Sequence, residues 1–374
     1  EFGLWISPDG GKQWAPFKGS DFPAVAVRDL AFQNRDASLV IATHGRGIWI
    51  IDDLTPLRAL DEKTLASEAA FLSTRPIQQR ISAWGGWSEG DAAFAGPNPP
   101  HGAEIVYYQK SRHLFGKLKI EVLDEQGQVI DTIPASVRRG INRVTWSMRA
   151  KPPRVPPAAQ IAFNSTQGPR VPPGTYTVRM TKGQDVYETK ITVGLDRRAT
   201  YSVADRRAQY DAAMRVRDLF GQMSDLVFKI NAVRAQTDAT AAKLAQGNAL
   251  RKQLIALSAK ADAIRKQIVA TKEGGAITGE ERLREHMDLL YGAIMFSDGK
   301  PTDDQIARID TLKRELGDVE KQFADFQSGE LAKANAGLQA AHLPAIEVPA
   351  AAPAEEGASG GTPEHPMRTP WERD

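Results

Sequence analysis

The sequence has no cysteine among its 374 residues, which excludes disulfides, thiolate catalysis and cysteine-based zinc sites. No apolar run approaches the roughly 20 residues that a membrane-spanning helix requires. The formal charge is only +2, which gives no electrostatic reason to expect nucleic acid or an acidic membrane surface as a partner. With 41% hydrophobic and 25% charged residues, the composition is that of a globular protein.

Motifs that carry chemistry are also missing. The sequence has no G-x-S-x-G, no H-E-x-x-H and no dinucleotide-binding fingerprint, and Gly10-Gly11-Lys12 lacks both the upstream glycine and the following Ser/Thr of a phosphate loop. We therefore predict no cofactor, no metal site and no catalytic residues, and we favour a chain that is not an enzyme in itself. The start at Glu1, without methionine or signal sequence, leads us to expect a processed product or a fragment.

Two or three domains are expected from the length, and the first covers residues 1–60. Two apolar runs, residues 39–43 and 48–51, bracket the turn His44-Gly45-Arg46-Gly47, which predicts a β-hairpin whose glycines permit positive φ. The region holds about four short strands, the size of one β-propeller blade. Residues 61–103 are rich in Gly and Pro and are predicted to be a linker.

Residues 104–195 alternate apolar and polar side chains with a period of two. Val144, Trp146 and Met148, for example, alternate with Thr145 and Ser147. This pattern predicts antiparallel strands with one buried face, and six or seven of them make an immunoglobulin-like β-sandwich. The Pro-rich insert 151–173 is long for a compact domain and is expected to be either packed or mobile.

From residue 200 to 342 the apolar spacing changes to alternating threes and fours, which predicts antiparallel helices packed through heptad positions. Ser202 with Asp205, Thr278 with Glu281 and Thr302 with Gln305 resemble capping boxes. Residues 343–374 are Pro/Ala/Glu/Gly-rich and are predicted to be a disordered tail. The fold class expected is thus all-β followed by a helical bundle. The predicted core positions are Leu219, Met223, Leu226, Ile230, Val233, Leu250, Leu254, Leu257, Ala261, Ile264, Ile268, Leu283, Met287, Leu290, Ile294, Leu316, Val319, Phe323 and Phe326.

Residues 7–14 fit the pattern S-x-D-x-G-x-x-W. The side chains of Ser7 and Asp9 are expected to bind backbone amides across a tight turn, Gly11 to take a conformation closed to other residues, and Trp14 to pack on the blade. The octapeptide resembles the Asp-box of BNR-repeat propellers, which include sialidases and sortilin-type proteins. An ordinary hairpin turn is the alternative. The resemblance implies a structural turn away from the ligand face, so Asp9 is not expected to be catalytic.

Further elements resemble, in the same order, the closing part of large bacterial sortilin-like BNR propeller proteins. Such a resemblance implies a propeller, an immunoglobulin-like domain, helices, and a secreted, periplasmic or cell-envelope location. It implies a C-terminal piece of a larger protein as well. The helical part resembles the family only in its order along the chain. The elements are LVIATHGRGIWIIDDLTPL at residues 39–57, Asn98–Gly102, Gly140–Trp146 and Pro172–Val178.

His44 and Arg46 are the best candidate ligand-binding residues. They are suited to the mouth of a propeller channel, where Arg46 would clamp a carboxylate or sulfate; alternatively, they cap the hairpin and pair with Asp52 or Asp53. Neighbouring residues on a strand point to opposite faces, so Asp52 and Asp53 are expected to serve in turns and caps rather than as an acid/base pair.

Two other groups of residues invite a functional interpretation. The aromatic residues of the linker, Trp84, Trp87 and Phe94, would either stack on sugar rings or pack the linker onto the propeller. His286 is expected on a helix surface.

Two functions from different classes follow. The first is a non-catalytic scaffold or binding module for a protein, peptide or glycan, with possible self-association through the helices and no nucleic-acid partner. Peptide binding, as in sortilin-type propellers, is a variant of it. The second is part of a sialidase-type glycoside hydrolase whose arginines, tyrosine nucleophile and acidic partners lie on other blades. A single blade cannot bury both of its faces alone, so residues 1–60 are expected to be marginally stable in isolation.

Overall fold

The computed structural model describes residues 2–17, 22–80, 102–272 and 280–350. Their contacts divide them into two compact units. The first comprises the residues up to Met148 together with Pro173–Ala199, and the second Arg149–Pro172 together with the residues from Thr200 onwards. The insert 149–172, which lies inside the predicted sandwich range, is therefore grouped with the helices. Each unit is considered by itself.

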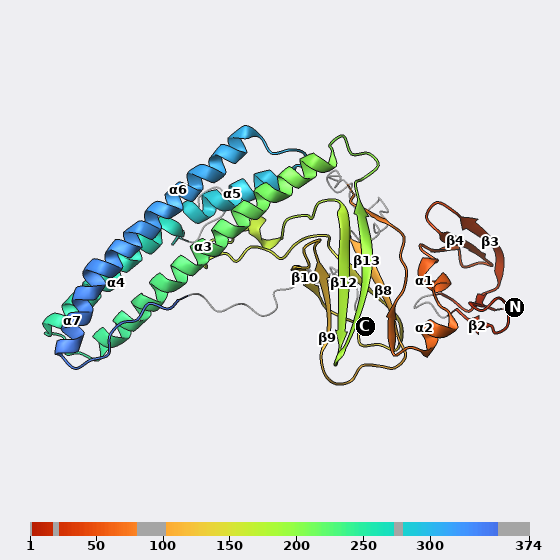
Figure 1. The fold of residues 1–374 in the computed structure, drawn as a ribbon, viewed down its shortest axis with the longest axis horizontal. Coiled ribbons are helices and arrows are strands. Elements are labelled where there is room, and N and C mark those ends of the chain that lie inside the picture. The colour runs from red at the N-terminus through yellow and green to blue at the C-terminus, as the bar shows by residue number, and fades with distance from the viewer. Residues whose placement is uncertain (1, 18–21, 81–101, 273–279, 351–374) are drawn as a thin grey trace. The chain divides into compact units, whose positions relative to one another are not determined.

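The described part of the first 60 residues holds five strands in two separate sheets, where about four strands of one blade were predicted. β1 pairs with β2, and β3, β4 and β5 form an antiparallel three-stranded sheet (Figure 1). The sheets stay separate because β1 and β2 are only two residues long, and the backbone N–H of Gly3 bonds the carbonyl of Val25 outside either sheet. The strands are β1 (Trp5–Ile6), β2 (Ala15–Pro16), β3 (Val27–Gln33), β4 (Ser38–Thr43) and β5 (Ile48–Ile51).

Two short helices, α1 (Thr55–Arg58) and α2 (Glu62–Ala66), follow β5. Their start signals are local: α1 has a proline in its first turn, and the Asp61 carboxylate accepts a hydrogen bond of 2.7 Å from the N–H of Thr64. The prediction of a purely β first half is corrected by these helices. The fold is mixed, with strands in several sheets followed by helices in the C-terminal part.

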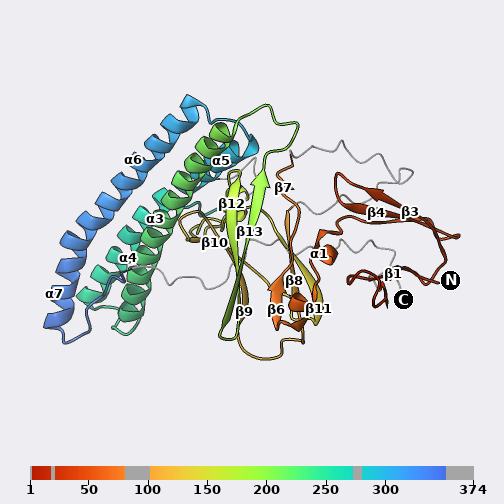
Figure 2. The same ribbon diagram turned by 45° about the vertical axis from the view of Figure 1, so that its right-hand side comes forward.

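The rest of the first unit contains a five-stranded and a three-stranded sheet. The larger has the order β10-β9-β12-β13-β7, the smaller β11-β8-β6, and all pairs are antiparallel except β13 with β7 (Figure 2). β6 and β7 come from the range predicted as a linker. Their bounds are β6 (Ala69–Phe71), β7 (Ile77–Gln78), β8 (Ala103–Gln109), β9 (Leu118–Leu123), β10 (Val129–Ile133), β11 (Gly140–Trp146), β12 (Gly174–Lys182) and β13 (Asp185–Gly194).

The apolar positions of the period-two pattern form the core between these sheets. Ile120, Val122, Val178 and Met180 are fully buried, as is Trp146. The ring of Trp146 on β11 meets the ring of Tyr176 on β12 edge to face, with 5.2 Å between centroids. Aromatic packing therefore joins one sheet to the other.

The second unit is helical, and its helices begin and end near the predicted places. Every predicted heptad position is buried except Leu250, which is half-buried. Ser202 and Thr302 each cap a helix with the expected partner three residues on, whereas α5 starts at Leu283 and Thr278 lies outside the described residues. The helices are α3 (Val203–Ala242), α4 (Ala249–Ile268), α5 (Leu283–Phe296), α6 (Asp303–Phe326), the π-helical turn η2 (Gln327–Leu331) and α7 (Ala332–Ala340).

Residues 149–172 contact α5 through several hydrogen bonds, and four of them converge on one carboxylate. Asp288, only 7% exposed, accepts hydrogen bonds from the N–H of Ser165 (2.9 Å), its hydroxyl (2.5 Å), and both the N–H and side-chain amide of Asn164. Both residues lie in the 3₁₀ turn η1 (Asn164–Thr166). The Pro-rich insert is thus packed in this part, one of the two outcomes its length suggested.

Residues 343–350 differ from the disordered tail predicted there. They run extended, and Ile346, at 4% exposure, belongs to the core of the helical unit. The reason is that the Ile346 side chain packs in the helical core. The backbone groups of Ile346 and Glu347 also hydrogen-bond with side-chain amides on α7 and α3. Residues 351–374 lie outside the described part of the chain.

Candidate functional site

The turn between β1 and β2 has the hydrogen bonds that the motif over residues 7–14 requires. The Ser7 hydroxyl donates to Asp9 (2.7 Å) and accepts from the N–H of Gly11 (2.7 Å), while the Asp9 carboxylate accepts from the N–H of Gln13 (3.0 Å). These bonds hold the pKa of Asp9 below its usual value, the backbone bond from Gln13 contributing most. Gly11 has φ +92°, a conformation that side chains other than glycine rarely adopt.

Trp14 does not pack on a blade as expected. Its side chain is 61% exposed, because β1 and β2 form a sheet of their own and nothing described extends that sheet beyond them. The turn is therefore formed without the aromatic contact that would seat it against a neighbouring strand.

The turn that carries His44 and Arg46 is built by its backbone. Thr43 donates to the carbonyl of Gly47 through both its N–H and its hydroxyl, and the Trp49 indole donates to the carbonyl of Arg46 (2.9 Å). Both side chains are exposed and, among the described residues, neither has a hydrogen bond or ion pair. The alternative pairing with Asp52 or Asp53 is thus not formed in this part of the chain.

The Asp53 side chain caps a helix, whereas Asp52 is exposed and its hydrogen bond with Ser38 is made by its backbone. The buried Asp53 carboxylate accepts from the N–H of Thr55 at the start of α1 (2.9 Å), and the Asp52 carbonyl accepts from the Ser38 hydroxyl (2.7 Å). Neither arrangement brings the two carboxylates to a common substrate. Trp84, Trp87 and Phe94 lie outside the described residues. His286 is partly exposed on α5, 3.3 Å from the Glu281 carboxylate.

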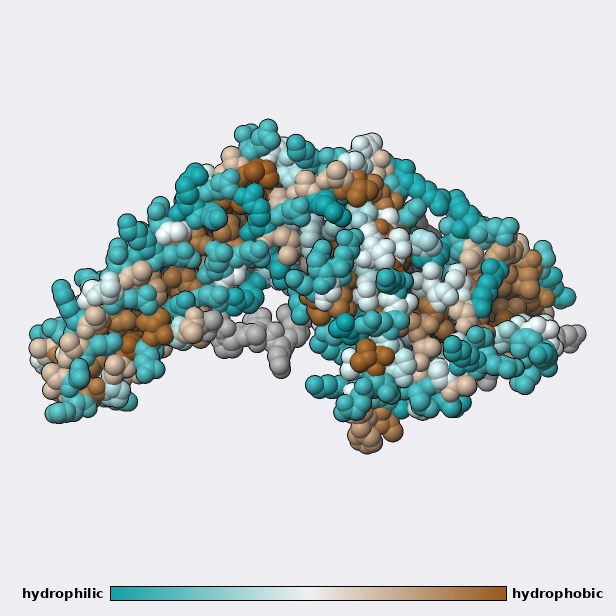
Figure 3. Space-filling view, viewed as in Figure 1, coloured by the Kyte–Doolittle hydropathy of each residue, from teal (hydrophilic) through white to brown (hydrophobic). Residues whose placement is uncertain are grey.

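Residues 39–42 of β4 and 48–51 of β5 are apolar on both faces of their sheet, whereas β3 places Asp29 and Gln33 on the face of Ile48 and Ile50. The strand register places Ile48 and Ile50 on one face, with Val40 and Ala42, and puts Leu30 and Phe32 on the other with Ile41. The second face is partly covered, since the Phe22 ring packs on Trp49 and the Arg58 guanidinium lies 4.6 Å from the centre of the Phe32 ring. The first is open: Ile48 is 71% and Ile50 57% exposed. Leu30 and Phe32 on the second face are also exposed, at 48% and 40%, and Figure 3 shows a hydrophobic area in the region of β3 and β4.

A polar cluster in the helical unit was missed by the sequence reasoning. The Asp298 carboxylate accepts from Arg170 (2.5 and 2.7 Å) and Tyr201 (3.3 Å) and lies 3.4 Å from the fully buried Arg206. Burial lowers the pKa of Arg206 and also that of Arg149, to about 10. No local sequence pattern predicts the cluster, because its members, from Arg149 to Asp298, are up to 149 residues apart.

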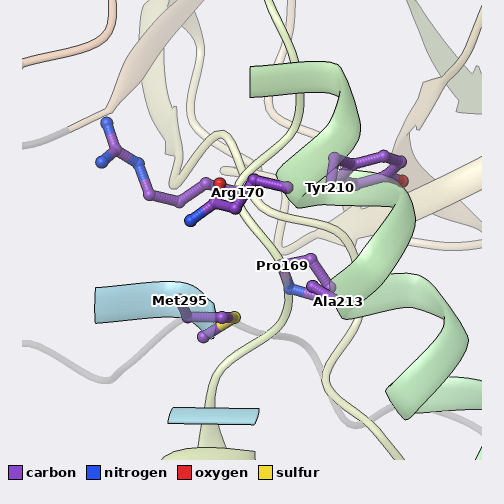
Figure 4. Close-up of a pocket in the computed structure, with 6 residues that line it drawn as sticks. Pro169, Arg170, Tyr210, Ala213 and Met295 are labelled. Carbon is purple, nitrogen blue, oxygen red and sulfur yellow. The ribbon is translucent and has the colours of Figure 1, made fainter. Parts of the chain in front are cut away.

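The crevice beside this cluster offers no ligand site. It is lined by Pro169, Arg170, Gln209, Tyr210, Ala213 and Met295 and is too narrow to admit a water molecule (Figure 4). The Gln209 amide is already committed to the carbonyls of Ile294 and Ser297. The arginines here therefore join the insert to the helices.

The described residues contain neither a cluster of metal ligands nor a membrane-spanning helix. No group of three or more His, Cys, Asp or Glu side chains there is placed to hold a metal ion. In the same residues no helix has the length and apolar character needed to cross a bilayer.

Comparison with known proteins adds little. No family model matches the chain, and no curated protein matches it. A solved structure described as "Biofilm associated protein - BSP domain" is similar at 12% identity and a TM-score of 0.19, over 50% of this chain and 23% of that one. The chain thus spans about a quarter of that protein, and a similarity this low supports no conclusion on fold or function.

Proposed function

We propose that this chain is a non-catalytic scaffold and binding module of an extracellular or periplasmic protein. In this proposal residues 1–60 belong to a β-propeller of the sortilin-like BNR/Asp-box type, residues 104–195 form an immunoglobulin-like sandwich, and residues 200–342 a helical bundle. The ligand would be a protein, peptide or glycan, bound on a propeller face that includes His44 and Arg46.

The observation behind the proposal is that residues 39–42 of β4 and 48–51 of β5 are apolar on both faces of their sheet, although β3 adds Asp29 and Gln33 to one face. A sheet covered on one side alternates apolar and polar residues, whereas a sheet that needs a neighbour on each side is apolar throughout. Propeller blades are sheets of the second kind, stacked around an axis. The open face with Ile48 and Ile50 is thus the place where we expect a further sheet to pack.

The turn geometry supports the same proposal. Ser7 and Asp9 hold the backbone of their turn, and the Asp53 carboxylate caps α1, so these polar groups serve the fold. His44 and Arg46 remain exposed, which suits recognition of an anionic ligand. The alternative, part of a sialidase-type hydrolase, would place its arginines, tyrosine nucleophile and acidic partners on other blades, and the arginine cluster closed around Asp298 would not be part of that site.

Thiol labelling tests the proposal, because the chain has no native cysteine. Ile50→Cys places a thiol on the open face, and Val186→Cys on β13, equally apolar and 58% exposed, is the matched control. Both should react with a maleimide in the 374-residue chain. In a longer polypeptide that supplies the neighbouring blade, as this proposal requires, we expect the thiol at position 50 to react at least about ten times more slowly and that at position 186 at an unchanged rate. Equal labelling at both positions would refute the covered sheet.

A further inference from the structure

Residues 343–348 lie in a groove of the helical unit. In Figure 1 this segment leaves the end of α7 and turns back beside α3. Ile346 is buried in the helical core, and Leu343 and Val348 pack beside it, while Pro344, Ala345 and Glu347 are exposed. The apolar side chains of the segment therefore contact the helices, whereas the side chains between them face solvent.

Two side-chain amides fix the backbone of the segment. Asn335 on α7 donates to the carbonyl of Ile346 (3.0 Å) and accepts from its N–H (2.8 Å). Gln236 on α3 does the same for the next residue, Glu347, at 2.7 and 2.9 Å. Each carboxamide thus satisfies both polar groups of one residue, as a neighbouring β-strand would. Such contacts hold an extended backbone regardless of side-chain identity.

The groove continues into an open pocket at the end of the segment. The pocket has a volume of about 490 Å³, and its walls combine apolar and charged side chains. Leu226 and Phe323 are among its apolar residues and Lys229 and Glu320 among its charged ones, and the segment itself lines it through Val348, together with the following Pro349 and Ala350. There is thus room for more side-chain volume than the segment supplies.

We propose that this groove is a binding site for extended peptides with a branched apolar residue at the place of Ile346, and that residues 343–348 are its occupant in cis. Backbone recognition by Asn335 and Gln236 gives affinity, and the core position of Ile346 with the pocket beyond Val348 gives selectivity. The partner is an extended apolar segment of another polypeptide, which must displace the chain's own segment. This inference is independent of the propeller and uses a different unit of the protein.

Peptide binding in trans tests the site. The probe is a fluorescent peptide of residues 343–350, Leu-Pro-Ala-Ile-Glu-Val-Pro-Ala, followed by anisotropy. In the full chain, Ile346→Asp weakens the cis occupant without changing the receptor side chains. We expect saturable binding to this variant and an apparent affinity for the unmodified chain that is roughly 10- to 100-fold weaker, because a tethered competitor acts at an effective concentration of about a millimolar.

Variants of the site distinguish specific recognition of the peptide from non-specific binding. Asn335→Asp, added to Ile346→Asp, keeps the acceptor but replaces the donor by a charge facing the carbonyl of the bound residue, and should weaken binding at least about tenfold. Gln253→Glu, an exposed change of similar kind on α4, is the control and should have no effect. The same peptide with aspartate in place of its isoleucine should not bind.

The outcomes decide the proposal. Should Ile346→Asp lose the helical circular dichroism, Glu347→Pro replaces it, since this change removes the N–H that bonds the Gln236 side chain and keeps Ile346 in place. A folded variant of either kind that fails to bind the peptide at about millimolar concentration overturns the inference. A dimer of the unmodified chain that Asn335→Asp dissolves would support the site and identify a second copy as the donor in trans.

Discussion

Replacing Asp288 by alanine is expected to release the turn η1 (Asn164–Thr166) from α5, while the other contacts of the insert with the helices remain. Four donors converge on this carboxylate, and two of them are the backbone N–H groups of Asn164 and Ser165. Ser165 is 3% exposed and Asp288 7%, so little water can replace the lost acceptor. The aspartate thus acts as a cap for a turn 123 residues away in the chain.

The magnitude follows from those contacts. A hydrogen bond to a charged group contributes about 1.5–3 kcal/mol, and a buried donor left without an acceptor costs about 1–3 kcal/mol. Counting only the two backbone donors, we expect Asp288→Ala to lower the free energy of unfolding of the helical unit by about 3–6 kcal/mol. Asp310→Ala removes an exposed ion pair with Arg215 and should cost less than about 1 kcal/mol.

Urea denaturation with two probes measures the effect. The tryptophans among the described residues all lie in the first unit, so their fluorescence reports that unit, whereas circular dichroism at 222 nm reports mainly the helices. The dichroism midpoint should fall for Asp288→Ala and barely move for Asp310→Ala. If both substitutions shift it equally, the carboxylate does not anchor the insert and the reasoning fails.

Two further predictions concern the same unit. Gly292→Ala would bring a Cβ into overlap with the Asn164 side chain and should destabilise the unit by about 1–3 kcal/mol. Gly317→Ala, in open space on α6, should not destabilise it. Equal effects of the two substitutions in urea denaturation would contradict the close packing at Gly292. The pKa of Glu280 is lowered to about 2, first by the N–H of Thr271 and then by Arg282, so its stabilising contribution is complete above pH 4.5 and is lost as the pH falls towards 2; an NMR titration of its carboxyl with a midpoint near 4.5 would refute this.

The helices were predictable because their information is local and repeated. Leu254, Leu257, Ala261, Ile264 and Ile268 mark one stripe of α4, and all five are buried. A heptad pattern predicts that a segment is a helix, which face of it is buried, and that this face packs against other helices. The capping residues Ser202 and Thr302 fixed two of the helix starts for the same reason.

The strands were predictable one by one, but their grouping into sheets was not. Period-two alternation identified β9, β11, β12 and β13, yet nothing in residues 69–71 or 77–78 indicated that these short stretches would extend the two sheets. Edge strands of two or three residues carry too little alternation to show a period. The separation of β1–β2 from β3–β5 is likewise set by pairing partners, not by local pattern.

Contacts between distant residues account for most of what sequence reasoning missed at the candidate sites. Asp288 looks like any polar residue of an amphipathic helix until η1 is placed against it. Ile346 stands alone between Ala345 and Glu347, in a composition typical of disorder, and no rhythm marks it as a core residue. Its burial depends on Asn335 and Gln236, whose amides are unremarkable on their own helices.

The exposed face of the sheet β3–β5 and the groove that holds residues 343–348 are suited to partners of different shape. The face with Ile48 and Ile50 is apolar but offers no fixed hydrogen bonds, so a partner there must bring a broad apolar surface, as another sheet does. The groove instead offers two backbone clamps and one deep apolar position, which suits a single extended strand. One substitution on each, Ile50→Lys and Asn335→Asp, should therefore abolish different interactions; loss of the same partner from both would show that the two surfaces are not independent.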